Sequence, residues 1–281
     1  MDKGVDPDSI AQVRGMTFPD HPPDGLEGVR AALEQARRPF FCTGTIPLDS
    51  TNPISILVCN KDSSDPAAFT AVQFPLKSND DIKPLLDASH QALFGRGDQN
   101  VLDPSYRRAL VLHKGDFGIH PAGSLEPHGL GILTSISESL LESSVLTERD
   151  AGSVIEQKES IFEWDWAIGV LSGRDYTSER GEERRRSIIA RLDKLNVYSE
   201  GDFFKGHVDT PSSEEMFGTL LINLPVEHEG GQLTIKEPLR GNEHEEFTTE
   251  WGKASGFEWV AFFSDCEHEV LPVTRGHRSV G

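Results

Sequence analysis

The sequence has few cysteines and few basic residues, and both shortages argue against whole classes of protein. The three cysteines Cys42, Cys59 and Cys266 are odd in number and lack metal spacing, so no disulfide framework is predicted. Lys and Arg number 27 against 46 Asp and Glu, which gives a formal net charge of −19. Because such a surface repels phosphate backbones and anionic lipids, we expect neither a nucleic-acid nor a membrane partner.

Long apolar runs and a secretory leader are also missing. Hydrophobic residues make up 36% of the 281 residues, and no stretch approaches the roughly 20 residues of a membrane-spanning helix. The polar start, Met1–Asp6, does not resemble a signal peptide. With the low cysteine content, these features predict an intracellular protein, cytoplasmic or nuclear, in a reducing compartment. The chain is long enough to bury a sizeable core.

The most informative pattern present is His207-Val208-Asp209, with a second histidine, His268, far along the chain. On a strand, residues two apart point to the same face, so His207 and Asp209 would face the same way. A second imidazole from a neighbouring strand would complete a facial set of two His and one carboxylate. This set leaves coordination positions open and favours non-haem Fe(II). Arg278 follows, a permanent cation that could hold a carboxylate beside the metal.

The other histidines, and a second arginine near Arg278, do not need a metal or ligand role to explain them. Ten histidines occur in the chain, and most are expected at the surface or as satisfied core residues. A second metal site in the segment that contains His113, His120 and His128 has no companion carboxylate or cysteine spacing to support it. Arg275 competes with Arg278 as the carboxylate anchor, and we prefer Arg278.

Several motifs after residue 188 occur together in the order of a known family. They are Y-x-x-G from Tyr198, H-x-D from His207, E-G-G-x-L from Glu229, and H-E-V from His268, followed by the basic Arg278. Residues 188–281 thereby resemble the iron(II)/2-oxoglutarate-dependent oxygenases of the prolyl 4-hydroxylase-like superfamily. The segment from Arg38 to about Leu141 resembles the less specific upstream region of a hydroxylase subgroup.

The resemblance implies roles for five residues. His207, Asp209 and His268 would be the iron ligands, Arg278 would anchor the distal carboxylate of 2-oxoglutarate, and Tyr198 would hydrogen-bond the same co-substrate. It further implies Fe(II), 2-oxoglutarate as co-substrate, and ascorbate as reductant. The implied reaction is hydroxylation of an unactivated C–H bond with release of succinate and CO2.

The substrate and two other activities stay open at this point. The substrate would be a protein, a peptide or a small molecule, and peptidyl proline is the choice that the family favours. One alternative is a catalytically silent β-helix that binds or scaffolds, because a fold does not fix a function. Another is a metal-dependent dioxygenase or hydrolase that uses no 2-oxoglutarate, against which Arg278 and Tyr198 argue.

The expected fold is mainly β with flanking helices (α+β). Short strands separated by Gly, Pro and polar turns after residue 190 favour an all-β core. The resemblance specifies a double-stranded β-helix, jelly-roll-like, supported by N-terminal helices. We expect a flexible leader over 1–25, a supporting region of helices and strands over 26–186, and the oxygenase core over 187–281. The family continues past the basic residue, so the final strand is expected to be truncated.

Individual elements upstream of the core are predicted from periodicity and capping signals. The predicted helices are Leu26–Arg38, Asp80–Phe94, Ile132–Leu141 and Arg184–Asp193. The predicted strands are Phe40–Cys42, Ile54–Cys59, Phe69–Phe74 and Leu195–Tyr198. Residues 142–185 carry no clear pattern apart from Ile161–Ile168, which is expected to pack.

Overall fold

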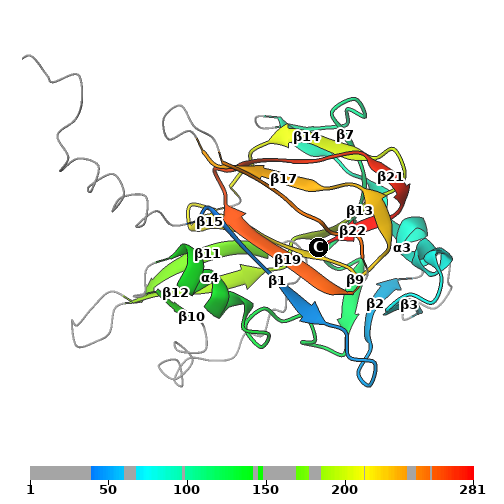
Figure 1. Cartoon of the computed structure of the whole chain (residues 1–281), viewed down its shortest axis with the longest axis horizontal. Helices are drawn as coiled ribbons and strands as arrows, with labels where there is room; N and C mark the ends of the chain where they lie inside the picture. The colour runs from blue at the N-terminus through cyan, green and yellow to red at the C-terminus, as the bar shows by residue number, and fades with distance from the viewer. Residues whose placement is uncertain are drawn as a thin grey trace, which may run out of the picture. The chain divides into compact units, whose positions relative to one another are not determined.

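The computed structural model describes most of the chain from Pro39 onward (Figure 1). The described residues are 39–59, 68–96, 99–141, 145–147, 169–176, 185–211, 213–238, 245–253 and 255–281. The predicted leader, the predicted helix Leu26–Arg38 and the packing of Ile161–Ile168 lie outside these residues. No described helix has the length and apolar character needed to cross a membrane.

A ten-stranded sheet forms the larger layer. Its strand order is β10-β12-β11-β15-β22-β13-β8-β4, and β19 pairs with β15 and with β1. The strands are β1 (Phe41–Pro47), β4 (His90–Gln91), β8 (Leu110–His113), β10 (Val145–Thr147), β11 (Gly169–Tyr176), β12 (Arg185–Arg191), β13 (Lys194–Tyr198), β15 (Met216–Asn223), β19 (Gly256–Phe263) and β22 (Arg278–Val280).

A five-stranded sheet lies opposite, in the order β18-β17-β20-β14-β7. Its strands are β7 (Arg107–Arg108), β14 (Phe203–His207), β17 (Leu233–Lys236), β18 (Glu246–Thr248) and β20 (Glu267–Val270). Smaller ladders join β16 (His228–Gly230) to β21 (Val273–Gly276), β5 (Phe94–Arg96) to β6 (Gln99–Val101), and β2 (Ile54–Cys59) to β3 (Phe69–Phe74) and β9 (Phe117–His120).

Two apolar clusters hold these layers together. One lies between the two sheets, because it combines Tyr198, Leu221 and Val260 of the larger sheet with Leu233 and Val270 of the smaller one. The other covers the opposite face of the larger sheet with side chains from the helices and from the β2–β3–β9 ladder. The mainly β class predicted from the sequence is confirmed, and two facing sheets are consistent with a jelly roll. The support by N-terminal helices stays a prediction.

The described helices are few and short. A 3-10 turn, Asn79–Ile82, begins at a capping box made by Ser78 and Asp81, and it leads into α3 (Lys83–Ala88). The predicted helix Asp80–Phe94 is therefore wrong in its second half. Ser89 takes an extended conformation after Ala88, and the next two residues pair with β8 as β4, so sheet pairing takes over from the helical pattern.

The helix α4 (Ile132–Leu140) confirms the prediction for Ile132–Leu141 to within one residue. Ile132, Ile136 and Leu140 form its buried face. The strand predictions for Ile54–Cys59 and Phe69–Phe74 are confirmed, and Leu195–Tyr198 lies within β13. The strand predicted at Phe40–Cys42 is β1, which begins one residue later and runs on to Pro47.

The predicted helix Arg184–Asp193 is wrong, because these residues form β12. This strand pairs with β11 along its whole length and with β10 on its other side. Its charged residues suit a helix by local preference, but the strand partners decide the conformation, because propensity is a weak prior that tertiary context overrides. Strands from before and after residue 186 share the larger sheet, and the division at 186/187 stays a prediction.

Candidate metal centre

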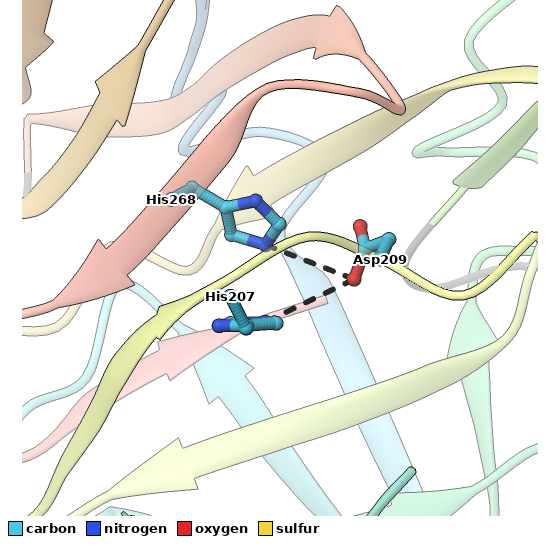
Figure 2. Close-up of side chains that lie close together, drawn as sticks. All are labelled: His207, Asp209 and His268. Atoms are coloured by element: carbon cyan, nitrogen blue, oxygen red, sulfur yellow. Dashed lines mark ion pairs between the residues drawn. The ribbon is translucent and has the colours of Figure 1, made fainter. Parts of the chain in front are cut away.

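Two strands of the smaller sheet bring the candidate ligands together. His207 ends β14 and lies directly opposite His268 of β20 in the antiparallel register. Asp209 follows two residues later, just past the end of the strand. Figure 2 shows both imidazole rings turned toward the Asp209 carboxylate. The Nε2 atoms of His207 and His268 lie 3.9 and 3.7 Å from Asp209 Oδ1, and the three candidate ligand atoms lie within 4.8 Å of one another.

Backbone carbonyls set the direction of each imidazole. His207 Nδ1 lies 2.9 Å from the carbonyl oxygen of Lys205, and His268 Nδ1 lies 3.1 Å from that of Cys266. A carbonyl can only accept a hydrogen bond, so in both rings Nδ1 carries the proton. The lone pairs on Nε2 are therefore free and point toward Asp209, which is the arrangement that metal-binding histidines require.

Burial and neighbouring charges favour the protonation states that a metal needs. Burial, followed by the nearby His268, lowers the pKa of His207, so this imidazole is neutral at neutral pH. Burial tends to raise the pKa of Asp209, but His268, the Thr219 hydroxyl and His207 together hold this pKa below its ordinary value. The cluster thus combines a neutral imidazole, which is the ligating form, with a carboxylate.

Aromatic rings fix the positions of these side chains. The Phe204 ring stacks on the His207 ring with 3.6 Å between centroids, and Phe262 lies 4.8 Å from His268. Arg107 lies over Phe204, 4.5 Å from its centroid, and its guanidinium donates hydrogen bonds to Asn196 Oδ1 and to the Leu93 carbonyl. No local pattern distinguishes Arg107 in the sequence, because its partners come from distant segments.

All five residues selected from the sequence line one cavity of about 450 Å³. Tyr198 of β13 and Arg278 of β22 reach it from the larger sheet, whereas His207, Asp209 and His268 reach it from the smaller sheet and its following loop. The competing residue Arg275 is exposed, and its Nη1 pairs with Glu229 Oε1 at 3.1 Å. Among the described residues, no other cluster of potential metal ligands is found.

Arg278 is the most unusual charge in this cavity. Its side chain is fully buried, and none of its three guanidinium nitrogens has a hydrogen-bond partner among the described residues. Burial lowers its pKa to about 10, so it remains a cation at neutral pH. Leaving a buried charge unpaired is costly, so this environment fits a ligand that carries a carboxylate to the guanidinium. The donor set and this cation together fit Fe(II) with an anionic co-substrate.

Two further residues contact the site, and sequence reasoning missed both. Thr219 of β15 donates its hydroxyl hydrogen to Asp209 Oδ2 at 2.7 Å. Trp251 lies with its ring 5.4 Å from Cζ of Arg278. A threonine inside the apolar run Met216–Leu224 was a usable signal, since a buried hydroxyl needs a partner. For Trp251 the sequence offers no comparable signal.

Comparisons with known proteins bear on this site directly. The family model described as the 2OG-Fe(II) oxygenase superfamily matches residues 194–280. No match was found among the curated proteins. The matched segment contains Tyr198, His207, Asp209, His268 and Arg278.

Several solved structures are similar to this chain. A prolyl hydroxylase from Trichoplax adhaerens, in complex with a hypoxia inducible factor oxygen degradation domain peptide fragment, is 15% identical, with a TM-score of 0.41 over 93% of this chain and 92% of that one. A prolyl-4-hydroxylase from Pseudomonas putida is 24% identical, with a TM-score of 0.23 over 31% of this chain and 46% of that one. An oxidoreductase of the 2OG-Fe(II) oxygenase family from Burkholderia pseudomallei is 14% identical, with a TM-score of 0.28 over 99% and 89%. The family match confirms, over residues 194–280, the resemblance to the iron(II)/2-oxoglutarate oxygenases that the sequence motifs predicted.

Proposed function

We propose that the protein is an iron(II)- and 2-oxoglutarate-dependent dioxygenase that hydroxylates an unactivated C–H bond. The proposal rests on one observation: a single cavity contains both a candidate metal-binding cluster and an unpaired cation. The cluster consists of two histidines and one aspartate, and the cation is the fully buried Arg278, whose guanidinium has no hydrogen-bond partner among the described residues. Because an unpaired buried charge is costly, this cation favours an enzyme with an acidic co-substrate over a metal-dependent enzyme without one.

Each of the five residues would have a role that follows from its position in the cavity. His207, Asp209 and His268 would hold the iron and leave part of its coordination sphere open. Arg278 would pair with the distal carboxylate of 2-oxoglutarate through two parallel charge-assisted hydrogen bonds, and Tyr198 would donate a hydrogen bond to the same co-substrate. When bound, iron, 2-oxoglutarate and dioxygen would supply the oxidation of the C–H bond, with succinate and CO2 as further products.

The chain's remaining contribution is to position the substrate and keep water away from the metal. Leu93 and Val208 line the cavity, yet 46% and 49% of their surfaces are exposed. Apolar side chains left exposed beside the ligands suit a substrate that presents an aliphatic group to the metal, held at a short and aligned distance. We propose a protein, peptide or small-molecule substrate, with peptidyl proline as the first candidate.

Succinate formation tests the proposal. The full chain would be supplied with Fe(II), 2-oxoglutarate and ascorbate, and then with pools of peptides and of metabolites. We expect succinate to form, and to form faster with the pool that contains the substrate, whose product gains the mass of one oxygen atom. His268→Ala should form none. If the iron-loaded parent binds no 2-oxoglutarate and forms no succinate with any pool, the proposal is wrong and a binding module takes its place.

A further inference from the structure

The two oxygens of the Asp209 carboxylate have different surroundings. Oδ2 accepts the hydroxyl hydrogen of Thr219 at 2.7 Å. Oδ1 instead faces the two imidazoles, 3.9 Å from His207 Nε2 and 3.7 Å from His268 Nε2. A carboxylate whose oxygens were equally free could rotate or bind a metal through both of them. The Thr219 hydrogen bond therefore occupies Oδ2 and leaves Oδ1 facing the two imidazoles.

Thr219 itself is held firmly. It belongs to β15, which pairs along its length with β19, and Thr219 lies opposite Phe262 in that ladder. Its side chain is only 3% exposed, so water does not compete easily for the hydroxyl. The branched side chain also restricts rotation about χ1. Phe262 in turn contacts His268, with 4.8 Å between ring centroids, so β15 and β19 support two of the three candidate ligands from the larger sheet.

From this arrangement we infer that Thr219 is a positioning residue for the metal centre. Its hydroxyl confines Asp209 to binding the metal through Oδ1 alone, in the orientation that faces both imidazoles. The inference rests on the proposed function and assigns a role to a residue outside the ligand set. Hydrogen-bond partners of ligating carboxylates commonly contribute 10–100-fold to metal affinity, so the expected effect is about that large.

Metal affinity of the 281-residue chain tests the inference without any need for activity. Mn(II) alone serves as the probe, and free Mn(II) is measured by electron paramagnetic resonance. Thr219→Val keeps the branched shape but removes the hydroxyl, so Mn(II) should bind about 10–100-fold more weakly. Thr219→Ser keeps the hydroxyl, so its affinity should stay close to that of the parent.

Thr234→Val is the matched control. Thr234 is also 3% exposed and lies on a strand, but its hydroxyl contacts that of Thr248 and not one of the three candidate ligands. We expect this variant to bind Mn(II) like the parent. Thermal melting of each metal-free variant reports on folding. Should Thr219→Val fail to fold, Thr219→Ala and Thr219→Ser repeat the comparison, because they differ only in the hydroxyl.

The outcomes distinguish a failure of the Thr219 inference from a failure of the proposed dioxygenase function. If the parent binds Mn(II) and Thr219→Val binds it equally well, the inference is wrong and the proposed function stands. If Thr234→Val loses as much affinity as Thr219→Val, general packing is the cause and the inference is again wrong. If the parent itself binds no Mn(II), Fe(II) or Co(II), both the inference and the proposed function fail.

Discussion

Tyr198 and Arg278 lie directly opposite each other on the antiparallel strands β13 and β22, and Cζ of Arg278 is 5.5 Å from the centre of the Tyr198 ring. Trp251 lies at 5.4 Å from the same atom. Aromatic faces attract a cation and shield it from water. They cannot neutralise it, so the guanidinium stays available to an anionic ligand that enters the cavity.

Arg278→Ala should weaken 2-oxoglutarate binding by roughly two to three orders of magnitude. Removing one partner of a buried ion pair costs about 3–5 kcal/mol, and each 1.4 kcal/mol is about tenfold in affinity. Anaerobic titration of the charge-transfer absorption of the Fe(II)–2-oxoglutarate complex measures the loss. Iron affinity should survive, and Arg278→Lys should be milder because an ammonium cannot form the two-pronged contact.

Arg275→Ala is the control for this substitution, because Arg275 is an exposed arginine paired with Glu229. It should bind 2-oxoglutarate like the parent. If Arg275→Ala loses the co-substrate while Arg278→Ala keeps it, the anchor assignment is wrong. If neither variant differs from the parent, the co-substrate proposal itself fails.

Tyr198→Phe removes only the hydroxyl from the same cavity wall. A neutral hydrogen bond contributes about 0.5–1.5 kcal/mol, so 2-oxoglutarate affinity should fall by up to about tenfold. The same anaerobic titration measures it. A loss as large as that of Arg278→Ala would mean that the tyrosine does more than donate one hydrogen bond.

Trp251→Leu should lower the affinity for 2-oxoglutarate but leave metal affinity unchanged. The Trp251 ring already contacts the guanidinium before the ligand binds, so removing it should loosen the position of the cation and weaken 2-oxoglutarate binding by less than Arg278→Ala does. Trp251→Phe keeps a ring over the guanidinium and should lose less. Isothermal titration with 2-oxoglutarate and with Mn(II) separates the two affinities, and an equal effect on both would contradict a role through Arg278.

His268→Ala should abolish stoichiometric metal binding, because it removes one of three candidate ligands. His228→Ala is a close control, since His228 is also buried and its Nδ1 likewise bonds the carbonyl two residues earlier, that of Val226. Metal content after loading and desalting measures both. Equal metal retention by the two variants would remove His268 from the ligand set.

The cysteines should differ sharply in reactivity toward a thiol reagent near pH 8. Burial raises the pKa of Cys42 to about 12, and burial with the nearby Asp265 carboxylate raises that of Cys266 to about 12, so neither forms appreciable thiolate. Cys59 is exposed. Titration with a disulfide reagent should therefore show one fast thiol per folded chain and three in denaturant. Rapid reaction of all three in the folded protein would contradict this burial.

The sequence by itself determined the features that depend on neighbours along the chain. The H-x-D spacing predicts that His207 and Asp209 project to one side of a strand end, whatever the rest of the fold. The β-branched and apolar run Ile54–Cys59 and the helical spacing of Ile132, Ile136 and Leu140 are also local patterns, and both elements form where they were predicted. The family motifs added the distal partners His268 and Arg278.

Only the tertiary structure decided the features that depend on partners far along the chain. β12 is a strand because β10 and β11 pair with it, against its local helical preference. The helix after Asn79 ends at Ala88 because β8 pairs with the residues that follow. Thr219 reaches Asp209, and Trp251 reaches Arg278, only after two sheets pack face to face. The local sequence can mark Thr219 as a buried hydroxyl that needs a partner, but it cannot name Asp209 as that partner, because contacts between layers leave no periodic pattern along the chain.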